Sequence, residues 1–150
     1  MKFSTSKNEL QEALQKLSKA TPLRSTLPVL GCVLINATNE KTTLIATDLE
    51  LTINIKLSVS IEEEGSAAVP LKQLYDITNE FPDGTRITIS IDSRNKIEIS
   101  TLSGAYDLMG KQKEEFPTTP KVDETKKIKI QGNVLKKVIN STLFAVSKDD

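Results

Sequence analysis

The segment from residue 51 to residue 61 constrains the fold most, because its side chains alternate strictly between apolar and polar. Aliphatic residues occupy the odd positions: Leu51, Ile53, Ile55, Leu57, Val59 and Ile61. Threonine, asparagine, lysine and serine fill the even positions. A period of two is typical of a β-strand with one face on a core and the other in water. The sequence therefore predicts one long strand here, in a sheet that is covered on one side.

An amphipathic helix is predicted near the N-terminus, after a short extended segment at residues 2–6. The apolar residues Leu10, Ala13, Leu14 and Leu17 follow the i, i+3, i+4, i+7 spacing of one helix face. The remaining positions are polar and partly cationic. A side chain just ahead of the helix, Ser6 or Asn8, can accept a hydrogen bond from its first turn.

A basic corner follows this helix. Arg24-Ser25-Thr26-Leu27 precedes Pro28, whose ring fixes φ and favours an extended conformation at the residue before it. We therefore expect Arg24 to lie at an exposed corner, and a buried strand to run from Val29 to Ile35. A second strand is expected at residues 42–47.

The same order of elements then recurs. A short strand at residues 66–69 leads to Pro70, which suits the first position of a helix with an apolar side formed by Leu71, Leu74, Tyr75 and Ile77. Three more strands are expected at residues 86–91, 96–100 and 105–110. Residues 1–120 are thus predicted to form one α+β domain, in which a strand, a helix and three strands occur twice.

The end of the sequence repeats its beginning. Residues 127–135 match residues 2–10 at a constant offset of 125, with a Lys, an Asn and a Leu identical. We therefore expect a linker at residues 121–126 and the start of a second, truncated domain at residues 127–150. Its helix would present four apolar residues with no sheet to cover them: Val134, Leu135, Val138 and Ile139. We therefore expect that the chain is a fragment, or that its last 25 residues pack poorly or contact a neighbouring molecule.

Composition narrows the class of protein. Cys32 is the only cysteine, which excludes an internal disulfide, and its apolar neighbours suggest a buried thiol. No apolar run approaches the roughly 20 residues of a membrane span, and the N-terminus lacks the apolar core of a signal peptide. We expect a soluble, cytoplasmic protein with no membrane partner.

The sequence offers little for catalysis. It has no histidine, and it contains no glycine-rich phosphate loop or nucleophile elbow. Asp48 and Glu50 are a close carboxylate pair, but at the start of a strand such residues more often cap a turn than catalyse. With Glu62–Glu64 they could bind a metal only as weak surface ligands. We expect no enzyme, no metal site and no cofactor.

The charge distribution favours a binding protein. The chain is neutral overall, but residues 1–24 carry a net charge of +3 and residues 40–64 a net charge of −4. Several cations lie on or beside the predicted helices: Lys16, Lys19, Arg24, Lys72, Lys136, Lys137 and Lys148. If the fold placed these helices on one surface, their cations could contact phosphates without reading bases. An ordinary solvated surface is the alternative.

Several short motifs resemble, in order along the chain, the N-terminal domain of the bacterial sliding clamp family, the beta subunit of DNA polymerase III. They are Met1-Lys2-Phe3, the segment Arg24–Gly31, Thr47-Asp48-Leu49-Glu50, Val69-Pro70, Asp76-Ile77 and Phe116-Pro117. The resemblance implies a DNA clamp fold, with sheets outside and helices around a central hole. It implies a processivity factor that encircles duplex DNA and tethers the replicative polymerase without catalysis.

The resemblance also implies roles for individual residues. Arg24 matches a DNA-contacting arginine, and Lys72 a basic position on the second helix, whereas Asp149 puts an acid where a polar contact is expected. Tyr106 and Leu108 match an apolar pair that packs against the partner subunit in a homodimeric ring, although they suit the core of an alternating strand equally well. Polymerase and clamp loader would bind to domains beyond Asp150.

The competing hypothesis is a small structural or regulatory protein. Its edge strand would pair with a partner, such as a true clamp for which it acts as a decoy.

Overall fold

The computed structural model describes residues 1–22, 25–39, 41–118 and 128–146. The chain divides into two compact units, Met1–Thr119 (unit 1) and Pro120–Asp150 (unit 2). The predicted linker at residues 121–126 lies outside the described residues.

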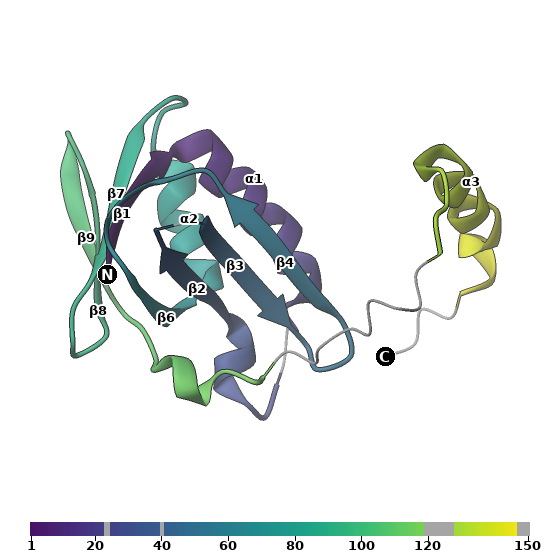
Figure 1. The fold of residues 1–150 in the computed structure, drawn as a ribbon, viewed down its shortest axis with the longest axis horizontal. Coiled ribbons are helices and arrows are strands. Elements are labelled where there is room, and N and C mark those ends of the chain that lie inside the picture. The colour runs from purple at the N-terminus through teal and green to yellow at the C-terminus, as the bar shows by residue number, and fades with distance from the viewer. Residues whose placement is uncertain (23–24, 40, 119–127, 147–150) are drawn as a thin grey trace. The chain divides into compact units, whose positions relative to one another are not determined.

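Unit 1 has the predicted α+β fold, in which a strand, a helix and a run of strands occur twice, with four strands in the first run and three in the second (Figure 1). The first copy consists of β1 (Lys2–Ser6), α1 (Lys7–Leu17), β2 (Cys32–Thr38), β3 (Lys41–Thr47), β4 (Thr52–Leu57) and β5 (Ser60–Glu63). The second consists of β6 (Gly65–Pro70), α2 (Leu71–Glu80), β7 (Arg86–Ile91), β8 (Lys96–Thr101) and β9 (Gly104–Met109). Short 3₁₀ helices are η1 (Ser18–Ala20), η2 (Pro28–Gly31) and η3 (Lys113–Glu115).

The two copies interlock through their first strands. One sheet has the order β5-β1-β7-β8-β9 and the other the order β4-β3-β2-β6, and all neighbours are antiparallel. β1 therefore pairs with β7 of the second copy, while β6 pairs with β2 of the first. Each copy completes the sheet of the other, so the domain is a single folding unit.

The prediction of one long strand at residues 51–61 was wrong, because the chain changes sheets at Ser58 and Val59. Leu57 ends β4 opposite Thr42, whereas Ser60 begins β5 opposite Ser4. At the break, the Thr5 hydroxyl donates a hydrogen bond to the Ser58 carbonyl at 3.1 Å. The alternation continues across the break because the inner faces of both sheets border the same core.

The strand predicted from Val29 also starts later than expected. Pro28 opens η2, and β2 begins only at Cys32. Val29 and Leu30 are buried as predicted, but in a helical turn, because the fixed φ of proline suits the first turn of a helix as well as a strand. Pro70 was predicted at the first position of the second helix, but it lies one residue earlier, as the N-cap residue of α2. It also ends β6.

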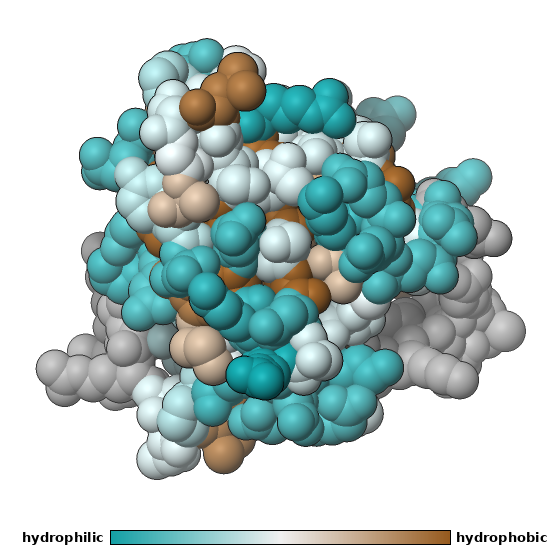
Figure 2. Space-filling view, turned by 90° about the vertical axis from the view of Figure 1, so that its left-hand side faces the viewer, coloured by the Kyte–Doolittle hydropathy of each residue, from teal (hydrophilic) through white to brown (hydrophobic). Residues whose placement is uncertain are grey.

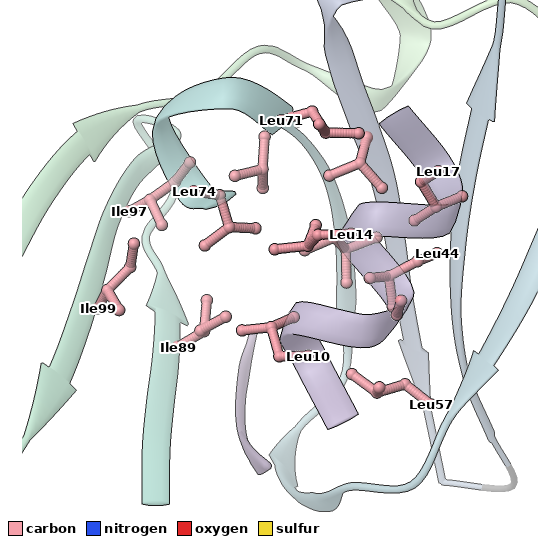
Figure 3. Close-up of a cluster of buried hydrophobic side chains, with 14 of the residues drawn as sticks. Leu10, Leu14, Leu17, Leu44, Leu57, Leu71, Leu74, Ile89, Ile97 and Ile99 are labelled. Atoms are coloured by element: carbon pink, nitrogen blue, oxygen red, sulfur yellow. The ribbon is translucent and has the colours of Figure 1, made fainter. Parts of the chain in front are cut away.

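One hydrophobic core joins both helices to both sheets. α1 and α2 contact each other and lie against the inner faces of the sheets (Figure 1). In Figure 3, side chains from each of these elements point towards one another, among them Leu14 of α1, Leu74 of α2, Ile89 of β7 and Leu44 of β3. The four predicted apolar positions of α1 are buried. Ser6 is its N-cap, and its hydroxyl accepts a hydrogen bond from the Glu9 N–H at 3.3 Å.

A smaller cluster covers the opposite face of the four-stranded sheet. Phe116, from the segment after η3, packs with Val29, Cys32, Ile45 and Ala68. The Cys32 thiol is buried as predicted, and burial raises its pKa because the thiolate would lose solvation. Nothing in the spacing of these residues indicated that the chain after β9 would return to this sheet.

Unit 2 contains α3 (Gly132–Thr142) and η4 (Leu143–Ala145). The apolar residues predicted to lack a covering sheet are exposed in the structure, with exposed fractions of about one half: Val134, Leu135, Val138 and Ile139. Residues 128–130, where the repeat predicted part of a strand, are not in a strand.

We expect Leu74→Ala to lower the free energy of unfolding by about 2–5 kcal/mol, because it opens a cavity where the two helices and a sheet meet. Leu102→Ala is the matched control, since Leu102 is fully exposed, and should change it by less than about 0.5 kcal/mol. Urea denaturation followed by circular dichroism measures both. Equal losses would contradict this assignment of the core.

Candidate nucleic-acid and subunit interfaces

The structure describes three of the five predicted DNA-binding cations. Lys16 lies in the last turn of α1, Lys19 in η1, and Lys72 in the first turn of α2. Arg24 and Lys148 lie outside the described residues, as does Asp149. All three described lysines are exposed because the apolar faces of the same helices are turned towards the core.

Lys16 is held in an intrahelical ion pair. Its Nζ lies 2.6 Å from Oε1 of Glu12, one turn earlier in α1, and both side chains are exposed. The hydrogen bond from Lys16, together with its positive charge, lowers the pKa of the Glu12 carboxyl. Glu followed by Lys at i, i+4 is the favourable order in a helix, so this pair also supports α1.

Lys72 forms a similar pair on α2. Its Nζ lies 2.6 Å from Oδ2 of Asp76, although the Lys72 side chain is 87% exposed. Here the cation precedes the anion, which is the less favourable order. Lys19, in contrast, has no acidic side chain within 4 Å in the part of the chain that the structure describes.

The helices of unit 1 are electrically balanced, which corrects the expectation that they are basic. Including η1, they carry the four cations Lys7, Lys16, Lys19 and Lys72 and the four anions Glu9, Glu12, Asp76 and Glu80. Lys7 is withdrawn from the surface, because its buried ammonium pairs with Asp83 at 2.6 Å. The count of charges over residues 1–24 missed the neutralising acids of α2.

A hollow of about 480 Å³ lies beside the Lys72–Asp76 pair, between η1, η2 and α2. Its lining includes Pro22, Leu71 and Tyr75, together with the Lys72 and Asp76 side chains. No sequence signal pointed to it, since it forms where η1, η2 and α2 come together in the folded domain.

The predicted subunit-interface residues lie on β9, an edge strand of the five-stranded sheet. Tyr106 is opposite Ile99 and Leu108 is opposite Ile97, so both are on the face of the sheet that borders the core. Leu108 packs against that core and is half-buried. Tyr106 is 44% exposed, and its ring meets Phe81 edge-to-face with centroids 5.7 Å apart.

A second hollow, of about 450 Å³, lies beside Tyr106 and Phe81 and separates the end of α2 from the start of β9. Figure 2 shows the side of unit 1 on which β7, β8 and β9 lie in Figure 1. Most of that surface is hydrophilic, and hydrophobic residues are exposed on it only in separate places. Tyr106 is partly accessible to solvent, whereas Leu108 contributes mainly to the core.

The Asp48 carboxylate caps a turn between β3 and β4. It accepts hydrogen bonds from the N–H groups of Leu51 at 2.7 Å and Glu50 at 3.0 Å, and these bonds lower its pKa. Leu49 between them has a φ of +83°, so the turn holds a residue in the left-handed region. The turn-capping interpretation of Asp48 is therefore confirmed.

Among the described residues, no group of three or more His, Cys, Asp and Glu side chains could hold a metal ion. None of the helices described is both long and apolar enough to cross a membrane.

We expect Asp48→Ala to lower the urea midpoint at pH 7, because two backbone N–H groups lose their acceptor. The folded-state pKa of Asp48 is lowered, so its contribution is present above the unfolded-state value of about 3.9 and is lost as the pH falls through the folded-state value. The difference in urea midpoint between the Asp48→Ala variant and the parent should therefore become smaller below about pH 4. Glu50→Ala is the control, and a gap that does not depend on pH would argue against the ionised cap.

Comparison with known proteins gives one consistent result. The family model described as "DNA polymerase III beta subunit, N-terminal domain" matches residues 1–120. Proteins named "Beta sliding clamp" match the whole chain, with 32% identity in Synechococcus elongatus and 28% in Chlamydia pneumoniae. The chain spans about two fifths of their length, at 40% and 41% respectively.

Solved structures agree. The "Caulobacter crescentus pol III beta" structure superposes on 100% of this chain and 40% of its own, with a TM-score of 0.92 and 26% identity. The DNA polymerase III subunit beta of Pseudomonas aeruginosa gives a TM-score of 0.87 and 27% identity, covering 100% of this chain and 41% of its own.

Proposed function

Because the chain belongs to the family of DNA polymerase III beta subunit N-terminal domains, we propose that it is the first part of a bacterial sliding clamp. In this role it would encircle duplex DNA without sequence preference and tether the replicative polymerase. The observation that carries the proposal is the match of the family model to residues 1–120. In this domain, the two interlocked copies bring α1 and α2 into contact.

The proposed activity is mechanical, without catalysis or a cofactor. Two features support it: the sequence has no histidine, and Asp48, the most prominent candidate acid, is occupied in capping a turn. A processivity factor of this kind acts by encircling the DNA. It would do so in the cytoplasm, where the chromosome is copied.

We further propose that unit 2 begins a second domain of the same kind. Val138 and Ile139 of α3 align with Ala13 and Leu14 of α1, which are buried in unit 1. The exposed apolar face of α3 would then be covered by strands equivalent to β3 and β4. The polymerase and the clamp loader would bind domains outside this chain.

In the whole protein, two subunits would close into a ring through the edge strand β9. Tyr106 suits this role, because it is half exposed beside a hollow at the end of β9. Leu108 would support the strand from the core side.

The DNA-contacting surface of unit 1 would be formed by the exposed side of its helices, with Lys16, Lys19 and Lys72. Arg24 and Lys148, which lie outside the described residues, stay predicted DNA contacts. Phosphate contacts of this kind depend steeply on salt. Since two of the three described lysines are paired with acids, we expect the affinity of this chain for DNA to be low.

Fluorescence anisotropy of a labelled duplex tests the proposal. The chain should bind weakly at 50 mM salt, with log K falling linearly with log salt by about 0.9 for each phosphate contact. Arg24→Ala, Lys19→Ala and Lys72→Ala should each weaken binding and flatten that slope. Lys41→Ala, a lysine at the start of β3, is the control. Binding that does not depend on salt would contradict the phosphate contacts.

The competing proposal is a small regulator that pairs through β9, which lies at an edge of the five-stranded sheet. Detection of the native protein in its source cells separates the two. The clamp proposal expects a mass of about 40 kDa, equal to about three copies of a 125-residue domain. A native product of 16.5 kDa would instead support the regulator.

A further inference from the structure

The charges on α2 are arranged against helix stability. A helix favours anions at its N-terminus and cations at its C-terminus. α2 has the reverse, with Lys72 in its first turn and Glu80 at its last residue. α1 follows the rule with Glu9 in its first turn and Lys16 in its last, and its N-terminal cation, Lys7, is paired with Asp83. Stability of the helix therefore accounts for the charges of α1 but leaves those of α2 without a reason.

The Lys72–Asp76 pair likewise adds little to the fold. The two side chains are 87% and 55% exposed, and exposed pairs of this kind contribute little to stability. Their order, cation before anion, is the weaker one in a helix. What the pair does change is the electrostatic field on the helix surface: a phosphate that approaches Lys72 meets the Asp76 carboxylate at 2.6 Å from the same ammonium group.

We propose that Asp76 competes with DNA phosphate for Lys72 and so keeps the affinity of the helix surface for DNA low. The inference rests on the proposed function, in which this surface faces the duplex. A phosphate must displace the carboxylate before it can bind the ammonium, and the released carboxylate then repels the phosphate. Asp76 is thus a residue that positions Lys72 and limits its contact with DNA.

The pair of Glu12 and Lys16 acts in the same direction on α1, but there the same contact also supports the helix. Substituting Glu12 would therefore change helix stability and DNA affinity together. Asp76 offers the cleaner test, because little stability depends on it.

The test compares five variants of the 150-residue chain with the parent by anisotropy of a labelled duplex between 50 and 200 mM salt. Asp76→Asn should raise the affinity two- to tenfold and steepen the salt dependence by up to about 0.9 in the log–log slope, because Lys72 becomes free to meet a phosphate. Glu80→Gln is the matched control: it removes one negative charge from the same helix, and no lysine pairs with Glu80 in the described residues. It should raise the affinity less and leave the slope unchanged.

The double variant Lys72→Ala/Asp76→Asn decides whether Asp76 acts through Lys72. Its affinity should fall to that of Lys72→Ala. The inference would be overturned if the double variant kept the gain in DNA affinity. It would also be overturned if Asp76→Asn gained no more affinity than Glu80→Gln. Circular dichroism and urea midpoints confirm that each variant folds.

The same experiment separates this inference from the proposed function. If Lys72→Ala and Lys19→Ala both leave the affinity of the parent unchanged, the helix surface is not where DNA binds, and both proposals fail. If they weaken binding but Asp76→Asn does not strengthen it, only the inference about Asp76 fails. Absence of measurable binding by Asp76→Asn at 50 mM salt would also overturn it.

Discussion

The core between the two sheets determines where everything else in unit 1 lies. Leu14, Leu74 and Ile89 come from three different elements and are completely buried together, which neither sheet could achieve alone (Figure 3). Because the apolar faces of α1 and α2 are fixed against this core, their polar faces are exposed to solvent. The exposure of Lys16 and Lys72 is therefore a consequence of packing on the other side of the same helices.

The repeated order of a strand, a helix and a run of strands could be predicted from periodicity, because half-buried strands and helices leave clear patterns of two and of about four residues. Periodicity could not predict which of the two sheets each strand joins. Apolar and polar side chains alternate without interruption over residues 51–61, yet this segment forms strands in two different sheets. The alternation indicates only which face of a strand is buried. The return of Phe116 to the four-stranded sheet had no local signal either, because its partners are contributed by β2, β3 and β6.

The exposure of the candidate lysines was predicted better than the charges around them. Lys16, Lys19 and Lys72 are exposed on or beside the helices, as their place in the periodic pattern indicates. The pairs of Lys16 with Glu12 and of Lys72 with Asp76 could also have been predicted, since the partners are four residues apart, but a net charge summed over a segment conceals such pairs. The half-exposure of Tyr106 depends on its position at a sheet edge and on the Phe81 ring, which sequence alone does not locate.

The exchange of first strands between the two copies has a consequence for synthesis on the ribosome. β1 is the first strand to emerge, but it pairs with β7, and the Ser4 and Thr88 hydroxyls that bond across this pair are 84 residues apart. The five-stranded sheet cannot be complete until β9 has also left the exit tunnel. Contacts this distant in sequence slow folding. The nascent chain must therefore leave β1 without β7 through most of the translation of its own domain, a period in which chaperones could bind the unpaired edge of that strand.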